Sequence, residues 1–127
     1  FINYEQIIPK EFLTTVRVNR LAFLNSLERA SVVAKENKNL IKLDIKDNNI
    51  NVLSNSESGN LNENVIINLD GKDVNIAFNS KYLCDALKAA GDEFVNINMN
   101  SSISPCIIRP YSGEEYLYLI LPIRINS

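Results

Sequence analysis

The sequence predicts an α+β fold made of two similar halves, and three observations support this prediction. First, the stretch VRVNRLAFLNSLERA, which begins at Val16, is echoed by IAFNSKYLCDALKAA, which begins sixty residues later at Ile76. Second, each stretch changes from strand-like alternation to the three- and four-residue spacing of apolar residues that is typical of a helix. Third, short segments rich in β-branched and aromatic residues follow each stretch, as expected for strands. A repeat of this kind indicates an internal duplication of one structural unit.

Within each half, the first strand is expected to pass directly into a helix. The alternating residues end at Asn19 in the first half and at Asn79 in the second. Asparagine suits this position because its side-chain oxygen accepts a hydrogen bond from a free backbone N–H of the first helical turn. Apolar residues then recur on one helical face, so Leu27 and Leu87 are predicted to be core residues. Gly91 is expected to end the second helix, since glycine readily adopts the left-handed conformation that follows many helices.

Three further strands are predicted after each helix. They cover residues 40–45, 48–55 and 63–69 in the first half and residues 93–99, 104–110 and 115–121 in the second. Turn-forming residues predict turns at Asp47–Asn49, at Asp70–Gly71 between the halves, and over residues 110–113. Residues 1–127 therefore form a single predicted domain of eight strands and two helices, with repeat one over about 4–70 and repeat two over about 71–125. Both helices are expected to cover one face of the sheet.

Length and composition place the chain among ordinary globular domains. It has 127 residues, of which 46% are apolar and 22% charged, with a net charge of −2 and an isoelectric point near 5.1. A domain that binds nucleic acid on its own is usually basic, so this balance argues against strong, freestanding binding but leaves room for a local basic face. Cys84 and Cys106 are expected to be reduced thiols of an intracellular, cytoplasmic protein. No apolar run approaches the roughly 18 residues that a membrane-spanning helix needs.

The sequence is poorly equipped for catalysis. It contains no histidine, which removes the commonest general base and the commonest metal ligand. Its four glycines are too scattered for a phosphate-binding loop. Acidic pairs occur in polar, turn-like stretches, where solvated surface groups are expected. These pairs are Asp44 and Asp47, Asp92 and Glu93, and Glu114 and Glu115. We therefore expect a non-enzymatic protein without a metal or cofactor.

The end of the chain carries the most specific motif. Residues 119–124, LILPIR, place a proline, an apolar residue and an arginine after an apolar strand. Matching segments are YEQIIP at residues 4–9, NRLAFLNSLERASVV at 19–33, FNSKYLCDAL at 78–87 and SPCIIRP at 104–110. Taken in this order and spacing, they resemble the C-terminal, third domain of the bacterial sliding clamp, the beta subunit of DNA polymerase III. The resemblance covers essentially the whole chain and implies the DNA-clamp fold.

The resemblance implies a ring in which this chain is one third of a subunit. A clamp subunit contains three copies of the domain. Two subunits close head to tail as a homodimer around duplex DNA, with the helices lining the hole and the sheets on the rim. Such a ring is a processivity factor that tethers the replicative polymerase and contacts DNA without sequence preference. The start at Phe1 rather than methionine agrees with a piece of a longer protein. The isolated domain is expected to be monomeric and to bind duplex DNA barely at all.

The resemblance also implies a pocket, between the second and third domains, for short apolar motifs of the polymerase, the clamp loader and repair proteins. In a peptide groove, apolar walls supply affinity and a few polar groups fix the orientation. The matching residues here are Ile7, Asn79, Tyr82, Ile103, Pro105, Leu119, Ile120, Leu121, Pro122, Ile123 and Arg124. Pro105 and the bulky residues 119–121 depart from the family pattern, so the preferred motif is expected to differ.

Two further surfaces follow from the resemblance. The residues expected to face DNA are Arg20, Arg29, Lys35, Lys81 and Lys88, on the two helices. Glu28 and Asp85 are interleaved with them, so the field is expected to be mild, and an ordinary solvated helix face is the alternative. Val32 and Val33, at the end of the first helix, are expected to meet the other subunit, with a core position as the alternative.

The strand before the tail leaves one question open. Tyr116, Tyr118 and Ile120 form one alternating set and the leucines at 117, 119 and 121 form the other, and one set must face the core. The other set then faces solvent, another domain or a ligand. Three rival functions also stay open: a stand-alone protein-interaction domain of the same fold without a DNA role, an enzyme with carboxylate-bound Mg²⁺, and a structural domain without a pocket.

Overall fold

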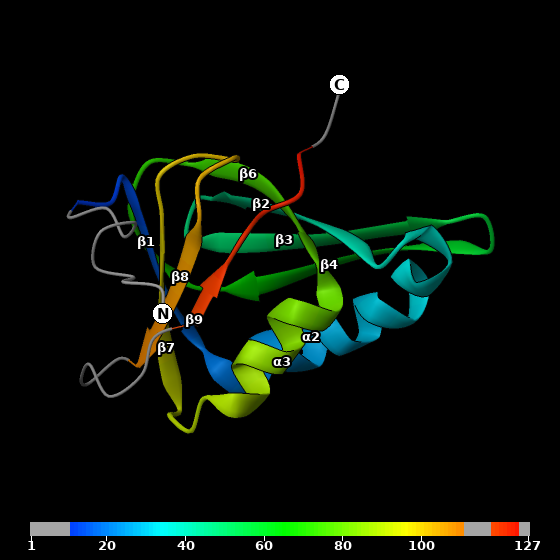
Figure 1. Cartoon of the computed structure of the whole chain (residues 1–127), viewed down its shortest axis with the longest axis horizontal. Helices are drawn as coiled ribbons and strands as arrows, with labels where there is room; N and C mark the ends of the chain where they lie inside the picture. The colour runs from blue at the N-terminus through cyan, green and yellow to red at the C-terminus, as the bar shows by residue number, and fades with distance from the viewer. Residues whose placement is uncertain (1–10, 111–117, 125–127) are drawn as a thin grey trace, which may run out of the picture.

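A computed structural model of the chain describes residues 11–110 and 118–124, which form two α-helices, a 3₁₀ turn and nine strands (Figure 1). The helices are α2, Arg20–Ala34, and α3, Ser80–Ala89, and the 3₁₀ turn at Lys35–Asn37 follows α2. The strands are β1 Thr14–Asn19, β2 Leu40–Lys46, β3 Asn49–Ser56, β4 Gly59–Ile66, β5 Asn68–Gly71, β6 Val74–Asn79, β7 Phe94–Met99, β8 Cys106–Pro110 and β9 Tyr118–Ile120. The predicted α+β class is confirmed.

The strands form two antiparallel sheets that exchange strands between the halves. One sheet has the order β5-β1-β7-β8-β9, and the other has the order β4-β3-β2-β6. The first strand of each half therefore pairs with strands of the opposite half, β1 with β7 and β6 with β2. The prediction of a single sheet is therefore wrong. Two sheets form because α2 and α3 each carry the chain from one sheet to the other, so the strand before a helix and the strand after it do not pair.

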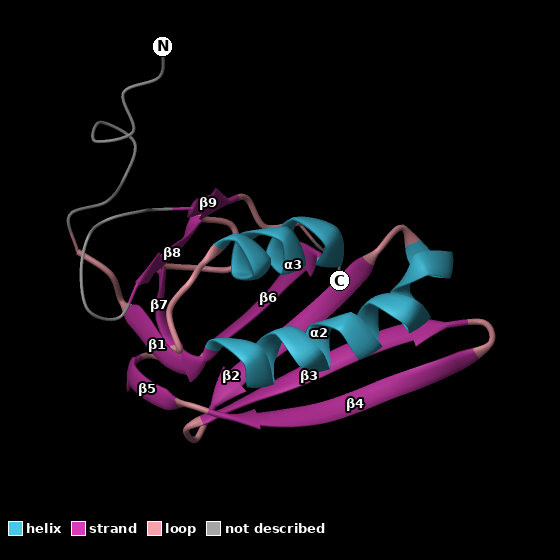
Figure 2. Cartoon of the chain, turned by 90° about the horizontal axis from the view of Figure 1, so that it is seen from below, coloured by secondary structure: helices cyan, strands magenta, loops and turns pink. Residues whose placement is uncertain are grey.

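The two helices lie side by side and cover the same side of the strands (Figure 2), as predicted. α2 packs against α3 and against β3 and β4, while α3 also contacts β6 and β9. Their inward side chains form the centre of the core, and Leu27 and Leu87 are fully buried, as expected. Removing such side chains from water is a main source of the folded state's stability.

Both helices begin in the predicted way, and the second ends differently. Asn19 Oδ1 accepts a hydrogen bond from the Ala22 N–H at 2.9 Å, and Asn79 Oδ1 accepts one from the Lys81 N–H at 2.9 Å. α3 ends at Ala89, and Gly91 does not adopt the left-handed conformation that the sequence analysis expected.

The guanidinium of Arg20 supplies the contacts at the end of α3 instead. Its Nη1 donates to the Leu87 carbonyl at 3.0 Å and its Nε donates to the Asp92 carbonyl at 2.7 Å. A side chain from the other half thus satisfies backbone groups that a helix end otherwise leaves free.

A tight turn between β2 and β3 organises the crossing between the sheets. Asp47 and Asn48 both have positive φ, of 53° and 55°, as the predicted hairpin requires. The Asn48 carbonyl accepts from the Ile67 N–H at 3.0 Å, and its side-chain oxygen accepts from the Leu69 N–H at 2.9 Å. These bonds break the predicted strand 63–69 at Ile67, so that β4 stays in one sheet and β5 joins the other.

Gly71 ends β5 rather than forming the predicted hairpin turn. β5 and β6 lie in different sheets, and the Lys72 N–H donates to the Leu13 carbonyl at 2.9 Å. Gly71 has φ of +107°, and a Cβ at this position would collide with the Leu13 carbonyl oxygen. Of the predicted turn over 110–113, residues 111–113 lie outside the described residues.

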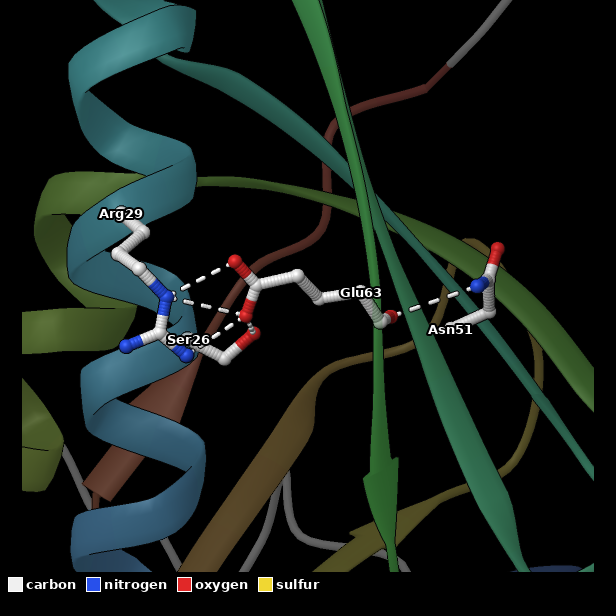
Figure 3. A network of polar contacts seen from close by, with 4 residues as sticks. All are labelled: Ser26, Arg29, Asn51 and Glu63. Atoms are coloured by element: carbon white, nitrogen blue, oxygen red, sulfur yellow. Dashed lines mark hydrogen bonds and ion pairs between the residues drawn. The ribbon is translucent and has the colours of Figure 1, made fainter.

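An ion pair connects α2 to β4 (Figure 3). Arg29 donates through Nη2 to Glu63 Oε1 at 2.6 Å and through Nε to Glu63 Oε2 at 2.8 Å, and Ser26 Oγ donates to the same carboxylate at 3.1 Å. Behind it, Asn51 Nδ2 donates to the Glu63 backbone carbonyl at 3.3 Å. Hydrogen bonding to Arg29 lowers the pKa of Glu63 below its usual value of 4.5. The same contact raises the pKa of Arg29.

Substitution of Gly71 by alanine is expected to destabilise the fold by at least about 1–3 kcal/mol, because an L-residue is strained at this φ and its Cβ meets a fixed backbone oxygen. Gly59→Ala is the matched control, since a Cβ at that β4 position has open space around it. Urea unfolding followed by circular dichroism measures both variants. Equal midpoints would contradict the strain at Gly71.

Protonation of Glu63 is expected to contribute to unfolding in acid. Because the folded-state pKa of Glu63 is lowered, its ionised form stabilises the fold above the ordinary glutamate pKa, and this contribution is lost as the pH falls through the lowered value. The effect should be small, because the Arg29 side chain is 57% exposed and screened by solvent. Urea midpoints from about pH 6 to about pH 3 should fall less steeply in Glu63→Gln than in the wild type. Glu28→Gln, next to Arg29 on α2, is the charge-matched control, and equal slopes in Glu63→Gln and Glu28→Gln would refute the contribution.

Candidate functional site

An open groove of about 520 Å³ lies between α3 and the end of the chain. Its lining residues are Tyr82, Asp85, Ala86, Tyr118, Leu119, Ile120 and Leu121. The first three lie on one face of α3, and the others come from β9 and the residue after it. We call this feature the apolar groove, because aliphatic and aromatic side chains make up most of its wall.

Side chains of β9 alternate between the core and the opposite face, and this alternation determines which of them are accessible at the groove. Ile120 is 7% exposed and belongs to the core, and Tyr118 packs partly against the core. Of the alternating set that contains them, the two described members, Tyr118 and Ile120, therefore face the core. Leu121 is 67% exposed and Tyr82 is 65% exposed, so two large apolar side chains stand at the groove without covering. Exposure of such neighbours is typical of a binding surface.

The tail, residues 121–124, runs from one sheet to the other. β9 ends at Ile120, and the Ile123 N–H donates to the Ala77 carbonyl on β6 at 2.8 Å. Pro122 lies between the two sheets, half-buried, and cannot donate a backbone hydrogen bond. Figure 1 shows this segment in red leaving β9 and passing β6. The tail is thus bonded at Ile123 to a strand of the opposite sheet.

The structure gathers some of the predicted pocket residues and separates others. Tyr82, Leu119, Ile120 and Leu121 line the apolar groove, with Pro122, Ile123 and Arg124 following in the tail. Asn79 caps α3 next to the groove. Ile103, 56% exposed, and Pro105 lie in the loop between β7 and β8 and do not line it. Ile7 lies outside the described residues.

Three groove residues were not predicted as pocket residues. Asp85 and Ala86 come three and four positions after Tyr82, so helical spacing places them on the same face and could have identified them. Tyr118 gave no such signal, because its alternating set was equally compatible with the core.

A second groove, of about 450 Å³, occupies the equivalent place in the first half, between α2 and β4. Its lining residues are Ala22, Asn25, Ser26, Arg29, Glu63, Asn64, Val65 and Ile66. The sixty-residue repeat matches its helical side to that of the apolar groove, for example Ala22 to Tyr82. On the strand side, residues 63–66 take the place of residues 118–121, so Ile66 corresponds to Leu121.

The two grooves occupy equivalent places and differ in their side chains. In the first half, Arg29 and Glu63 form a bidentate ion pair in the wall of the groove, and Ser26 joins it. We call this groove the polar groove. In the second half, Ala86 stands in place of Ser26, and Tyr118 stands in place of Glu63. The apolar groove is therefore the one that can take an apolar ligand, since such a ligand would desolvate no ion pair there.

The five residues expected to face DNA divide into two groups. Arg20 donates to two backbone carbonyls and Arg29 is paired with Glu63. Lys35, Lys81 and Lys88 are exposed and form no salt bridge with another described residue. The cationic groups that remain for a ligand are fewer than the sequence analysis expected, because sequence alone does not reveal the long-range partners of the arginines.

The two valines near the end of α2 also differ. Val32 is 76% exposed, and Val33 is half-buried. Neither valine belongs to the core cluster, so the structure does not support the alternative of a core position.

The two cysteines lie in the interior of the fold. Cys84 and Cys106 are buried free thiols, and burial raises the pKa of Cys106 to about 12. Burial also raises the pKa of Cys84.

Within residues 11–110 and 118–124, no group of three or more metal-binding side chains comes together. In the same part of the chain, neither helix is long and apolar enough to cross a bilayer.

Comparison with known proteins agrees with this architecture. The family model for the DNA polymerase III beta subunit, C-terminal domain, matches residues 5–124. The chain is 34% identical to the beta sliding clamp of Synechococcus elongatus over 98% of its own length and 34% of the relative's. The beta sliding clamp of Bacillus subtilis is also 34% identical, over 93% of this chain and 32% of that protein.

Solved structures give the same result. The DNA polymerase III beta subunit of Thermotoga maritima superposes with a TM-score of 0.94 at 35% identity, covering 99% of this chain and 35% of that one. The Bacillus subtilis sliding clamp superposes with a TM-score of 0.92 at 32% identity, covering 99% of this chain and 34% of that one. The chain spans about a third of the length of these relatives. It belongs to the family of C-terminal domains of the DNA polymerase III beta subunit, the bacterial sliding clamp.

Proposed function

We propose that this chain is the third domain of a ring-shaped sliding clamp, and that its apolar groove binds short linear motifs of replication and repair proteins. The observation that carries the proposal is the apolar groove itself, in which Leu121 and Tyr82 stand exposed on either side of a mostly apolar wall. The expected partners are the replicative polymerase, the clamp loader and repair proteins. The clamp would act as a processivity factor by tethering them.

The physics of the groove favours a peptide with apolar anchors. Burying a leucine-sized side chain contributes about 1.5–3 kcal/mol, so two or three anchors support a specific but reversible complex. Polar groups beside the groove, such as the Tyr82 hydroxyl and the exposed Arg124, can orient the peptide backbone. In the proposed clamp, the second domain of the subunit would supply the other side of the pocket. Binding to this chain alone should therefore be weak.

The proposed DNA role rests on few charges. Lys35, Lys81 and Lys88 are exposed on the helices and in the turn after α2. Few neutralised phosphates give weak, salt-sensitive contact, which suits a protein that must slide. We also propose that Val32, with Val33 beside it, contacts the neighbouring subunit, since an exposed valine of this kind gains by burial in an interface.

Leu121→Ala is expected to weaken binding of a short synthetic peptide with leucine and phenylalanine anchors roughly tenfold, through the loss of apolar contact area. A chemical-shift titration measures dissociation constants in the weak range expected here. Ile66→Ala is the matched control, because Ile66 is the exposed counterpart of Leu121 in the polar groove. The groove assignment fails if Leu121→Ala and Ile66→Ala bind the peptide equally well.

Duplex DNA is expected to bind this chain detectably only at low salt. If only the three lysines proposed to face DNA neutralise phosphates, the slope of log K against log salt should be shallower than about −3. Fluorescence anisotropy of a labelled duplex measures it, and replacing Lys35, Lys81 and Lys88 by glutamine should remove the binding. Lys46→Gln, in a β2 residue paired with Asp44, is the control. Micromolar binding at physiological salt would contradict the weak field.

A further inference from the structure

We propose that Ile123 is a positioning residue for the apolar groove: its backbone hydrogen bond to Ala77 sets the place of the Leu121 side of the wall. The inference rests on the proposed peptide-binding function. It adds that a bond outside the groove, between the tail and the opposite sheet, determines how well the groove accepts a ligand.

The internal symmetry of the chain shows what the tail replaces. In the first half, the chain leaves β4 and pairs with β1 through the four residues of β5, with Asn68 opposite Arg17. The sixty-residue repeat carries Arg17 onto Ala77. Ala77 is the residue that Ile123 faces in an isolated antiparallel bridge. The tail is therefore the second half's counterpart of β5, reduced among the described residues to one bridge.

Leu121 depends on this bridge because little else fixes its backbone. The pairing of β9 with β8 ends at the Cys106–Ile120 pair, so Leu121 has no partner in the ladder. Its side chain is 67% exposed and does not belong to the core cluster. Pro122 follows with a fixed φ and no N–H. The position of Leu121 is thus set from its two sides, by Ile120 in the ladder and by Ile123 on β6.

The polar groove shows that this dependence is particular to the second half. Ile66, the counterpart of Leu121, pairs with Asn49 in the ladder of β3 and β4. The next residue, Ile67, donates to the Asn48 carbonyl at 3.0 Å. The strand wall of the polar groove is therefore fixed before the chain reaches β5. In the apolar groove, the corresponding support among the described residues comes from the contact of Ile123 with Ala77.

A ligand that contacts Leu121 is then coupled to the docking of the tail. If the docked tail binds the ligand better, the ligand must stabilise the docked tail by the same factor, because such coupling is reciprocal. Binding should therefore slow hydrogen exchange of the Ile123 N–H. A wall that was rigid for other reasons would leave this exchange rate unchanged.

The test compares Ile123→Pro, which lacks the N–H, with Ile123→Ala, which keeps it and removes the side chain. Two-dimensional NMR of the whole chain reports the resonances of Leu121 and Tyr82, and the same leucine- and phenylalanine-containing peptide is titrated into each protein. We expect Ile123→Pro to shift both resonances and to weaken peptide binding about tenfold, the size of one hydrogen bond's contribution. Ile123→Ala should leave the Leu121 and Tyr82 resonances near their wild-type positions and should weaken binding less than Ile123→Pro, because it keeps the backbone bond. In the wild type, the peptide should slow exchange at Ile123.

The outcomes separate this inference from the proposed function. If Ile123→Pro leaves the Leu121 and Tyr82 resonances unchanged, the positioning role is wrong, whether or not the peptide binds. If those resonances move but wild-type protein does not bind the peptide, the tail does set the wall and the proposed function is wrong. If Ile123→Ala weakens binding as much as Ile123→Pro, the side chain acts and not the backbone bond, which also overturns the inference.

Discussion

β1 pairs with β7 over six residues and β6 pairs with β2 over six residues, so each half begins with a strand that completes the sheet of the other. The remaining architecture depends on this exchange. Each exchanged strand enters a helix without a loop, which explains why an asparagine cap stands at both junctions. Each helix then returns the chain to the opposite sheet. The core under the helices is shared, and neither half encloses a core of its own.

The grooves follow from the same arrangement. A helix and the last strand of its own half approach each other without pairing or full packing, and this happens once in each half. Duplication therefore yields two grooves of similar shape, and side chains alone decide their use. An ion pair occupies the first, and aromatic and aliphatic side chains line the second. A difference of a few residues, such as Glu63 against Tyr118, distinguishes a groove that contains an ion pair from a groove with a mostly apolar wall.

The features that sequence predicted well are those that local chemistry determines. The two asparagine caps and the turn at Asp47–Asn48 depend on residues within three positions, so their chemistry is visible in the chain. The break at Ile67 depends on a bond to Asn48, and the end of α3 depends on Arg20, more than sixty residues away. Such long-range partners have no local signature.

The site was predictable to a similar degree. Tyr82 and residues 119–121 followed from the resemblance, and Asp85 and Ala86 could have followed from helical spacing. The bridge from the tail to Ala77 could not have been predicted from the pattern of apolar residues, because a single backbone bond leaves no mark on side-chain chemistry. The same holds for Arg29, whose partner Glu63 lies on a different element.

The connection between the two halves is short: the exposed residues Lys72 and Asp73 join β5 to β6. This connection bears on how a duplicated fold can evolve. A single copy of the repeating unit could satisfy its exchanged strand only by meeting a second copy, in a twofold-symmetric pair of the kind that small oligomers favour. The short connection turns that encounter between molecules into one within a chain, where the effective concentration is far higher. Once the two copies were joined, they no longer had to remain identical. One groove could then acquire an ion pair while the other stayed apolar, a division of labour that a symmetric ancestor could not have evolved.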